Sequence, residues 1–265
     1  MAQASFNFPF QGTLGGVSFY TTKRGNKLIA RLKGGPTAEQ IKTLPQFKPV
    51  RDNMQEFAAC SKAAGRLNQA TYGLKPLSNY NITAAFVKKC SQILKLDTEH
   101  LRGQRSLLFS RFGKLLEGFN VNNTKSFEQI IMYEPSFTID KPAYRATIYF
   151  TEMYPGINFD SPFNYPFFRL IGVLGVLPDM IYTTDGHQPV NRKVQSNPVM
   201  TKTDWNNCDE VYPGDHIELQ LPEGTIVDDS ISLVLSVGIE FGYYKGGGKI
   251  GEGSVGRARK ILAVR

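Results

Sequence analysis

The chain has 265 residues, of which 41% are hydrophobic and 12% aromatic, and a formal net charge of +8. This composition lies outside the range of disordered proteins, and 25 glycines and 15 prolines favour a turn-rich fold that contains β-structure. The length fits one large domain or two closely packed ones.

Charge is distributed unevenly along the chain. Residues 1–118 hold 18 Lys or Arg against 6 Asp or Glu, residues 119–244 hold 7 against 16, and residues 245–265 hold 6 against 1. A basic region attracts phosphates or an acidic protein surface. Two interpretations follow. Either the basic regions bind nucleic acid, or basic and acidic regions bind each other, within one subunit or between neighbouring copies.

The sequence predicts neither a secretory signal nor a membrane span. Residues 1–16 are interrupted by polar residues and proline, and the longest apolar run, residues 170–177, is far shorter than the ~20 residues of a spanning helix. That run is predicted to be a buried strand. We expect a cytoplasmic protein with no membrane partner, and export by a signal-independent route or release by lysis stays open.

The first ten residues alternate with the period of a strand. Phe6, Phe8 and Phe10 fall on one face, and Pro9 has no N–H to donate, which restricts the segment to a sheet edge or an arm. We predict an assembly arm, formed by these three phenylalanines, that completes the sheet of a neighbouring subunit.

Two β-prone runs, residues 12–20 and 27–32, predict a hairpin around Gly25 and Asn26, which tolerate positive φ. Basic residues crowd this hairpin, and a second basic group follows the glycines near the C-terminus. Both groups are candidate contacts to nucleic acid or to an acidic protein surface: Lys23, Arg24, Lys27, Arg31, Lys33, Arg257, Arg259 and Lys260.

Helices are predicted after the hairpin. Thr37 and Gln40 have the spacing of a capping box. Apolar residues at helical spacing predict a long amphipathic helix over residues 51–69, and the same period continues over residues 82–96 and 101–116. Residues 1–121 are therefore expected to form a basic hairpin and helical domain.

After residue 121 the apolar period changes to two, which predicts strands separated by Pro, Gly and Asp turns. The predicted strands cover residues 127–134, 143–153, 167–176, 199–203, 216–221 and 231–244, and the core face of the last one carries Leu233, Leu235, Val237, Ile239 and Phe241. The fold class is thus α+β: an N-terminal β-hairpin plus helices, followed by an antiparallel β-sandwich of jelly-roll or Ig-like type. This second domain, residues 122–265, is predicted to end in a basic Gly-rich tail.

The N-terminal region carries the motif G-T-x-G-G-x-x-F-Y-x-T-K over residues 12–23, followed by Pro45, Phe47, Arg51 and Phe57. In these residues it resembles an uncharacterised protein family of Bacteroidota, over about the first 70 residues. The resemblance implies a shared N-terminal module. It implies no catalytic residue.

Motifs for catalysis or cofactor binding are weak. The run 246–251 matches G-x-G-x-x-G, but too few residues follow it for a dinucleotide-binding βαβ unit. His100, His187 and His216 lack the spacing of zinc ligands. The three cysteines are widely spaced, which indicates buried thiols in a reducing compartment. We therefore expect no enzymatic activity, no cofactor and no metal site.

Two functional hypotheses remain. The first is a non-enzymatic structural protein that forms a homomeric assembly, such as a filament, tube or shell, through terminal arms and complementary charged regions. The alternative is a nucleic-acid-binding protein that uses the basic N-terminal half and the C-terminal tail.

Overall fold

A computed structural model of the chain describes residues 11–22, 28–32, 34–77, 81–120, 122, 125–192, 194, 197–225, 228–253 and 256–265. The chain divides into two compact units, Met1–Arg51 and Asp52–Arg265. The boundary that we expected between residues 121 and 122 instead falls inside the second unit. The reason is that helices before this position share a hydrophobic core with strands after it.

The N-terminal unit contains a three-stranded antiparallel sheet of order β1-β2-β3. Its strands are β1 (Gly12–Leu14), β2 (Val17–Thr21) and β3 (Leu28–Leu32). The predicted strand over residues 12–20 is itself a hairpin, because Gly15 and Gly16 adopt φ values of 55° and 80° and turn the chain. Helix α1 (Ala38–Thr43) begins at the predicted capping box, and a 3-10 turn, η1 (Pro45–Phe47), follows it.

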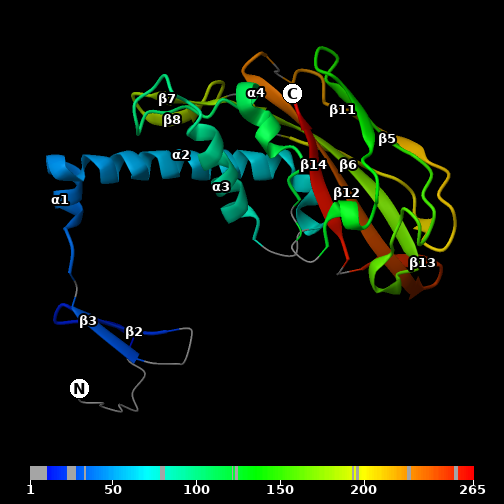
Figure 1. The fold of residues 1–265 in the computed structure, drawn as a ribbon, viewed down its shortest axis with the longest axis horizontal. Coiled ribbons are helices and arrows are strands. Elements are labelled where there is room, and N and C mark those ends of the chain that lie inside the picture. The colour runs from blue at the N-terminus through cyan, green and yellow to red at the C-terminus, as the bar shows by residue number, and fades with distance from the viewer. Residues whose placement is uncertain are drawn as a thin grey trace. The chain divides into compact units, whose positions relative to one another are not determined.

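The second unit is built on two antiparallel sheets (Figure 1). The larger one centres on β6 (Phe167–Pro178) and β12 (Ile231–Gly246), with β9 (Val199–Lys202) and β10 (Asn206–Asn207) beside β6, and β13 (Lys249–Glu252) and β14 (Ala258–Val264) beside β12. The smaller one has the order β11-β5-β4, from β4 (Ser136–Asp140), β5 (Arg145–Phe150) and β11 (Asp215–Gln220). A separate hairpin joins β7 (Met180–Thr183) and β8 (Gly186–Pro189).

The two sheets pack face to face, with alternate residues of each strand pointing into the space between them. Ile148 of β5 and Ile217 of β11 lie directly over Gly172 of β6, where a Cβ atom would be 2.8 Å from the Ile217 side chain. The predicted core face of β12 is confirmed, since all five of its residues are at most 1% exposed. The antiparallel α+β fold expected from the sequence is the fold observed.

Helices cover the other face of the larger sheet. They are α2 (Lys48–Ala70), η2 (Tyr72–Leu77), α3 (Thr83–Leu94), α4 (Phe109–Phe112) and η3 (Gly113–Leu116). The end of α2 reaches the sheet at Gly175, where a Cβ atom would lie 2.2 Å from the carbonyl oxygen of Ala70. No helix in the described ranges is long and apolar enough to cross a membrane.

Three predicted elements differ in the structure. The predicted Gly-rich tail is absent, because residues 249–252 and 258–264 form strands β13 and β14, and every residue of β14 is buried. Residues 127–134 are no strand: they begin with the 3-10 turn η4 (Phe127–Gln129), which a Ser126 capping box starts. Residues 101–108 are not helical, since Gly103 adopts a φ of 89° against Asp52 and Leu107 bonds to Met180.

Candidate functional site

The candidate site is one face of the N-terminal sheet. The strand register places Leu14 opposite Val17, and Val17 opposite Leu32, so that the three form a row across the sheet. Side chains two residues apart on a strand point to the same face of the sheet, so Phe19, Ala30 and Leu28 lie on the same face as this row. Together they form the apolar sheet face: Leu14, Val17, Phe19, Leu28, Ala30 and Leu32.

The apolar sheet face is accessible. Leu14 is 67% exposed, Leu32 is 76% exposed and Leu28 is 42% exposed. None of the described residues of the N-terminal unit is buried. Antiparallel sheets normally pack one apolar face against a core and leave the other face in water. This sheet has the apolar face but lacks a core within its own described residues.

The N-terminal unit is also strongly basic. Residues 1–51 hold eight Lys or Arg and one acidic residue, Glu39, which gives a net charge of +7. Residues 52–265 hold 23 basic and 22 acidic residues, a net charge of +1. Arg31 is exposed on the opposite face of the sheet, paired across the strands with Ser18. The unit therefore combines an apolar surface with an excess of positive charge.

Part of the predicted contact set lies outside the described residues. Its members are the arm residues Phe6, Phe8 and Phe10 and the basic residues Lys23, Arg24, Lys27 and Lys33. Their roles stay predictions.

The predicted basic contact near the C-terminus is internal. Lys260 is 7% exposed, and its Nζ lies 2.8 Å from Glu128 Oε1 and 3.0 Å from Glu134 Oε1. Burial disfavours the charge of Lys260, but the hydrogen bonds to the two carboxylates outweigh this effect and raise the pKa of Lys260 above its ordinary value. Basic and acidic segments thus bind each other here within one subunit.

The two arginines beside Lys260 are likewise part of the fold. Arg259 is 2% exposed, and its Nη1 donates to the carbonyl oxygen of Thr71 at 3.4 Å, just past the end of α2, where a cation is favourable. Arg257 pairs with Glu252 at 3.8 Å, and only 15% of its side chain is exposed. Arg259 and Lys260, which were predicted as contacts to nucleic acid or to an acidic protein surface, are therefore buried inside the second unit.

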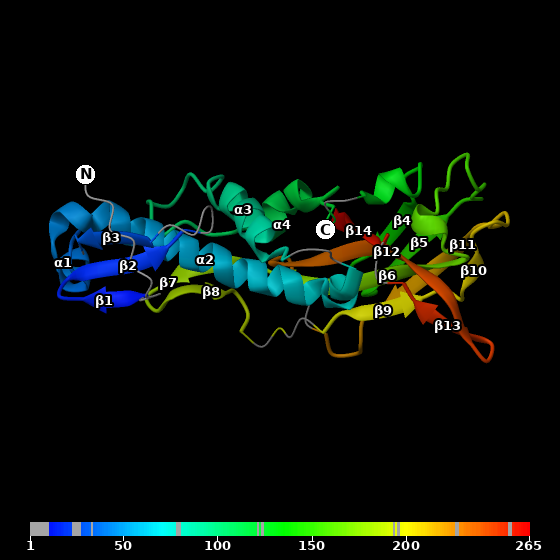
Figure 2. The ribbon, with the colours of Figure 1, turned by 90° about the horizontal axis from the view of Figure 1, so that it is seen from below.

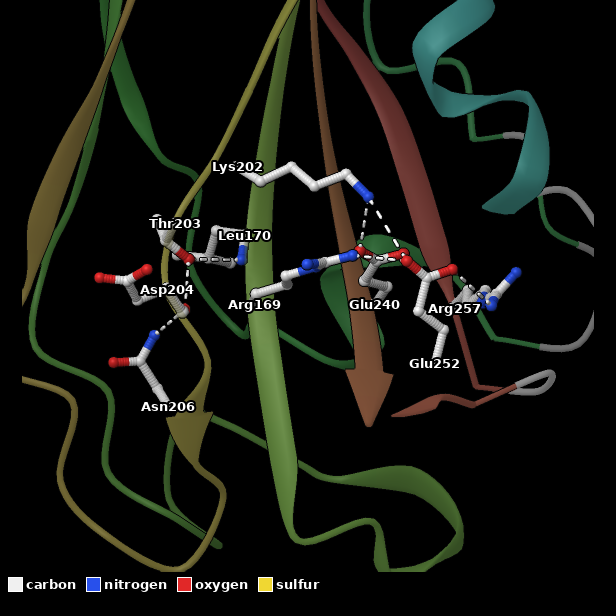
Figure 3. A network of polar contacts seen from close by, with 9 residues as sticks. All are labelled: Arg169, Leu170, Lys202, Thr203, Asp204, Asn206, Glu240, Glu252 and Arg257. Atoms are coloured by element: carbon white, nitrogen blue, oxygen red, sulfur yellow. Dashed lines mark hydrogen bonds and ion pairs between the residues drawn. The ribbon is translucent and has the colours of Figure 1, made fainter. Parts of the chain in front are cut away.

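A network of charged side chains joins four strands of the larger sheet (Figure 3). Glu240 of β12 is 2% exposed and accepts hydrogen bonds from Arg169 Nε on β6 and from Lys202 Nζ on β9, the latter at 2.9 Å. Arg169 Nη2 also donates to Glu252 of β13 at 2.6 Å. The guanidinium lies 4.3 Å from the ring centroid of Trp205. Each charge has an opposite partner, so the network fixes strand positions.

Side chains suited to catalysis are dispersed. Cys60, Cys90 and Cys208 are buried and form no disulfide, and burial raises the pKa of Cys60 and Cys208 to about 11, so that these thiols stay protonated at neutral pH. In the part of the chain that the structure describes, no three His, Cys, Asp or Glu side chains gather as metal ligands. Residues 246–248 all have positive φ and form the turn between β12 and β13, not a strand-to-helix loop.

The three histidines contact different parts of the fold. His187 is 4% exposed, and its Nε2 lies 2.7 Å from the carbonyl oxygen of Arg105. His100 bonds to Asp97 at 2.8 Å, and His216 stacks on Tyr149 with 6.2 Å between ring centroids.

Comparison with known proteins gives no relative. No protein-family model matches the chain, and neither a curated protein nor a solved structure matches it. The resemblance of the first 70 residues to a Bacteroidota family therefore stays a prediction.

Proposed function

We propose that this chain is a non-enzymatic structural protein that assembles with copies of itself, into a filament, tube or shell, through its N-terminal unit. The observation that carries the proposal is the apolar sheet face, which stays accessible in a unit without a buried described residue. Large contiguous apolar surfaces on soluble proteins mark interaction sites. In the assembly, a second copy packs on the apolar sheet face and removes it from water.

The apolar sheet face can contribute to the free energy of association. Burying one leucine side chain contributes roughly 1.5–3 kcal/mol. Leu14, Leu28 and Leu32 together therefore contribute several kcal/mol, from which the costs of association and side-chain ordering are subtracted. Helix α2 adds further apolar surface just past the unit boundary, because Met54 is 60% exposed and Phe57 is 65% exposed.

The proposed partner is a second copy rather than nucleic acid. A nucleic-acid backbone is bound mainly by basic and polar groups, and it leaves an apolar sheet face uncovered. Two of the residues suggested for nucleic-acid contact, Arg259 and Lys260, are buried. The positive charge of the N-terminal unit is instead complementary to residues 119–244, whose net charge is −9.

Replacing Leu14 and Leu32 together with Glu should weaken self-association by at least about tenfold, because two carboxylates would have to lose water in the contact. The measurement is the molar mass by size-exclusion chromatography with light scattering. The matched control is Leu101→Glu, at a leucine of the second unit that is 74% exposed, and it should leave the mass unchanged. A double variant that assembles like the unmodified protein would show that the sheet face is not the contact.

A further inference from the structure

If the N-terminal unit binds a second copy, as the proposed function states, that copy must present a complementary surface. This inference therefore rests on the proposed function. Three loops, residues 130–134, 151–166 and 207–215, meet at one end of the two sheets, beyond β10 and β11 (Figure 2). Met153 and Tyr212 exchange backbone hydrogen bonds of 2.9 and 3.0 Å, and the Met132 N–H donates to the Asn158 carbonyl at 2.9 Å. These bonds join the loops into one surface, here called the loop end.

The loop end exposes large apolar side chains from all three loops. Met132 is 52% exposed, Tyr154 is 39%, Ile157 is 74% and Val211 is 52%. Single exposed apolar residues are ordinary, but these four belong to loops that are hydrogen-bonded to one another. The loop end therefore carries a second set of exposed apolar side chains, which belong to the second unit.

A cavity of about 320 Å³ opens at the loop end. Its lining combines Tyr165 and the buried Phe159 and Cys208 with the polar residues Ser161, Asn164 and Asp209. Phe159 packs on Phe168 with ring centroids 4.6 Å apart, and both rings belong to the main core. Part of the lining thus belongs to the core, and the cavity has the size of a preformed binding pocket.

The charge of the loop end favours a basic partner. The three loops hold no Lys or Arg, and their six acidic residues are Glu134, Glu152, Asp160, Asp209, Glu210 and Asp215. Glu134 pairs with Lys260 and Asp160 with Lys125, whereas Asp209 and Glu210 are exposed on the third loop. An acidic surface with apolar side chains complements a basic unit with an apolar face.

We propose that the loop end is the acceptor surface for the N-terminal unit of a second copy. The apolar sheet face packs on the exposed apolar side chains of the loops, beside the exposed Asp209 and Glu210. Donor and acceptor are different surfaces, so the contact is heterologous. Each added copy leaves one donor and one acceptor free, and growth continues as an open chain or closes as a ring.

The test uses two defective variants and their mixture. The donor variant is Leu14→Glu with Leu32→Glu, and the acceptor variant is Asp209→Lys with Glu210→Lys. A matched control, Glu223→Lys with Asp229→Lys, makes the same charge change at two exposed positions outside the loop end. Circular dichroism of each variant should match that of the unmodified protein, because all six positions are exposed.

Each defective variant alone should remain a single chain, whereas their equimolar mixture should form a complex of two chains and nothing larger by light scattering. The control should assemble like the unmodified protein. An acceptor variant that assembles like the control overturns the assignment of the loop end, while a donor variant that fails to assemble still supports the proposed function. If both variants are defective and their mixture forms no complex, the heterologous contact is wrong. If the unmodified protein is a single chain, both proposals fail.

Discussion

Replacing Glu240 with Ala should lower the free energy of unfolding by about 3–5 kcal/mol, the usual cost of removing one partner from a buried ion pair. Glu240 is 2% exposed and lies between Arg169 and Lys202. Without the carboxylate, two cations on neighbouring strands would face each other with only Glu252 left to pair with them. The measurement is chemical denaturation followed by circular dichroism.

The control for this prediction is the exposed pair Arg192 and Asp185, whose side chains are 66% and 73% exposed. Asp185→Ala should change stability by no more than about 0.5 kcal/mol, because exposed ion pairs contribute little. Equal effects of the two substitutions would mean that the network of Glu240 does not hold the strands together.

Replacing Gly175 with Ala should also destabilise the protein, by about 3 kcal/mol, since the added methyl group would meet backbone rather than a movable side chain. Its Cβ would lie 2.2 Å from the Ala70 carbonyl oxygen and 2.9 Å from the Ala70 Cα. The same substitution at Gly65 is the control. Gly65 lies exposed in the interior of α2 with no atom within 4 Å of its Cβ position, so Gly65→Ala should stabilise by roughly 0.5–1 kcal/mol.

If Gly175→Ala lowers the free energy of unfolding by much less than about 3 kcal/mol, the end of α2 can move away from β6. Thermal unfolding of the two variants side by side measures the difference in sign directly, because one substitution should lower the melting temperature and the other should raise it.

Local chemistry explains which elements could be predicted from the sequence. The capping box at Thr37 and the alternating face of β12 depend on residues close in sequence, and both are confirmed. β14 could not be predicted, because its Arg259 and Lys260 are charged and follow a Gly-rich run. Their partners, Thr71, Glu128 and Glu134, are far away in the chain, and only the fold brings them together.

The apolar sheet face and the loop end could be predicted from the sequence only in part. The alternation of apolar residues at Val17 and Phe19, and at Leu28 and Leu32, predicts an apolar face on the N-terminal sheet. The sequence could not show that no described residue of the unit covers this face. The absence of Lys and Arg from residues 203–244 was a visible signal for an acidic surface. The sequence could not show that this acidic segment lies beside the loops that precede β4 and β6. The backbone hydrogen bonds between Met153 and Tyr212 show this contact in the structure.

The structure shows that the basic residues near the C-terminus and the described ones of the N-terminal unit lie in different surroundings. The basic C-terminal residues neutralise carboxylates inside the second unit, as the pairing of Lys260 with Glu128 shows. The N-terminal unit instead holds eight basic residues and one acidic residue, an excess of positive charge that its own sequence does not balance. An interaction that depends on this excess should weaken as salt screens it.

Self-assembly is tested most directly by the molar mass of the unmodified 265-residue chain in sedimentation velocity at low salt, from a few to tens of micromolar. We expect species of several chains whose mass rises with concentration and falls when salt is added, because the contact joins surfaces of opposite charge. A mass of one chain, 29.6 kDa, at every concentration would contradict the proposal that the N-terminal unit binds a second copy.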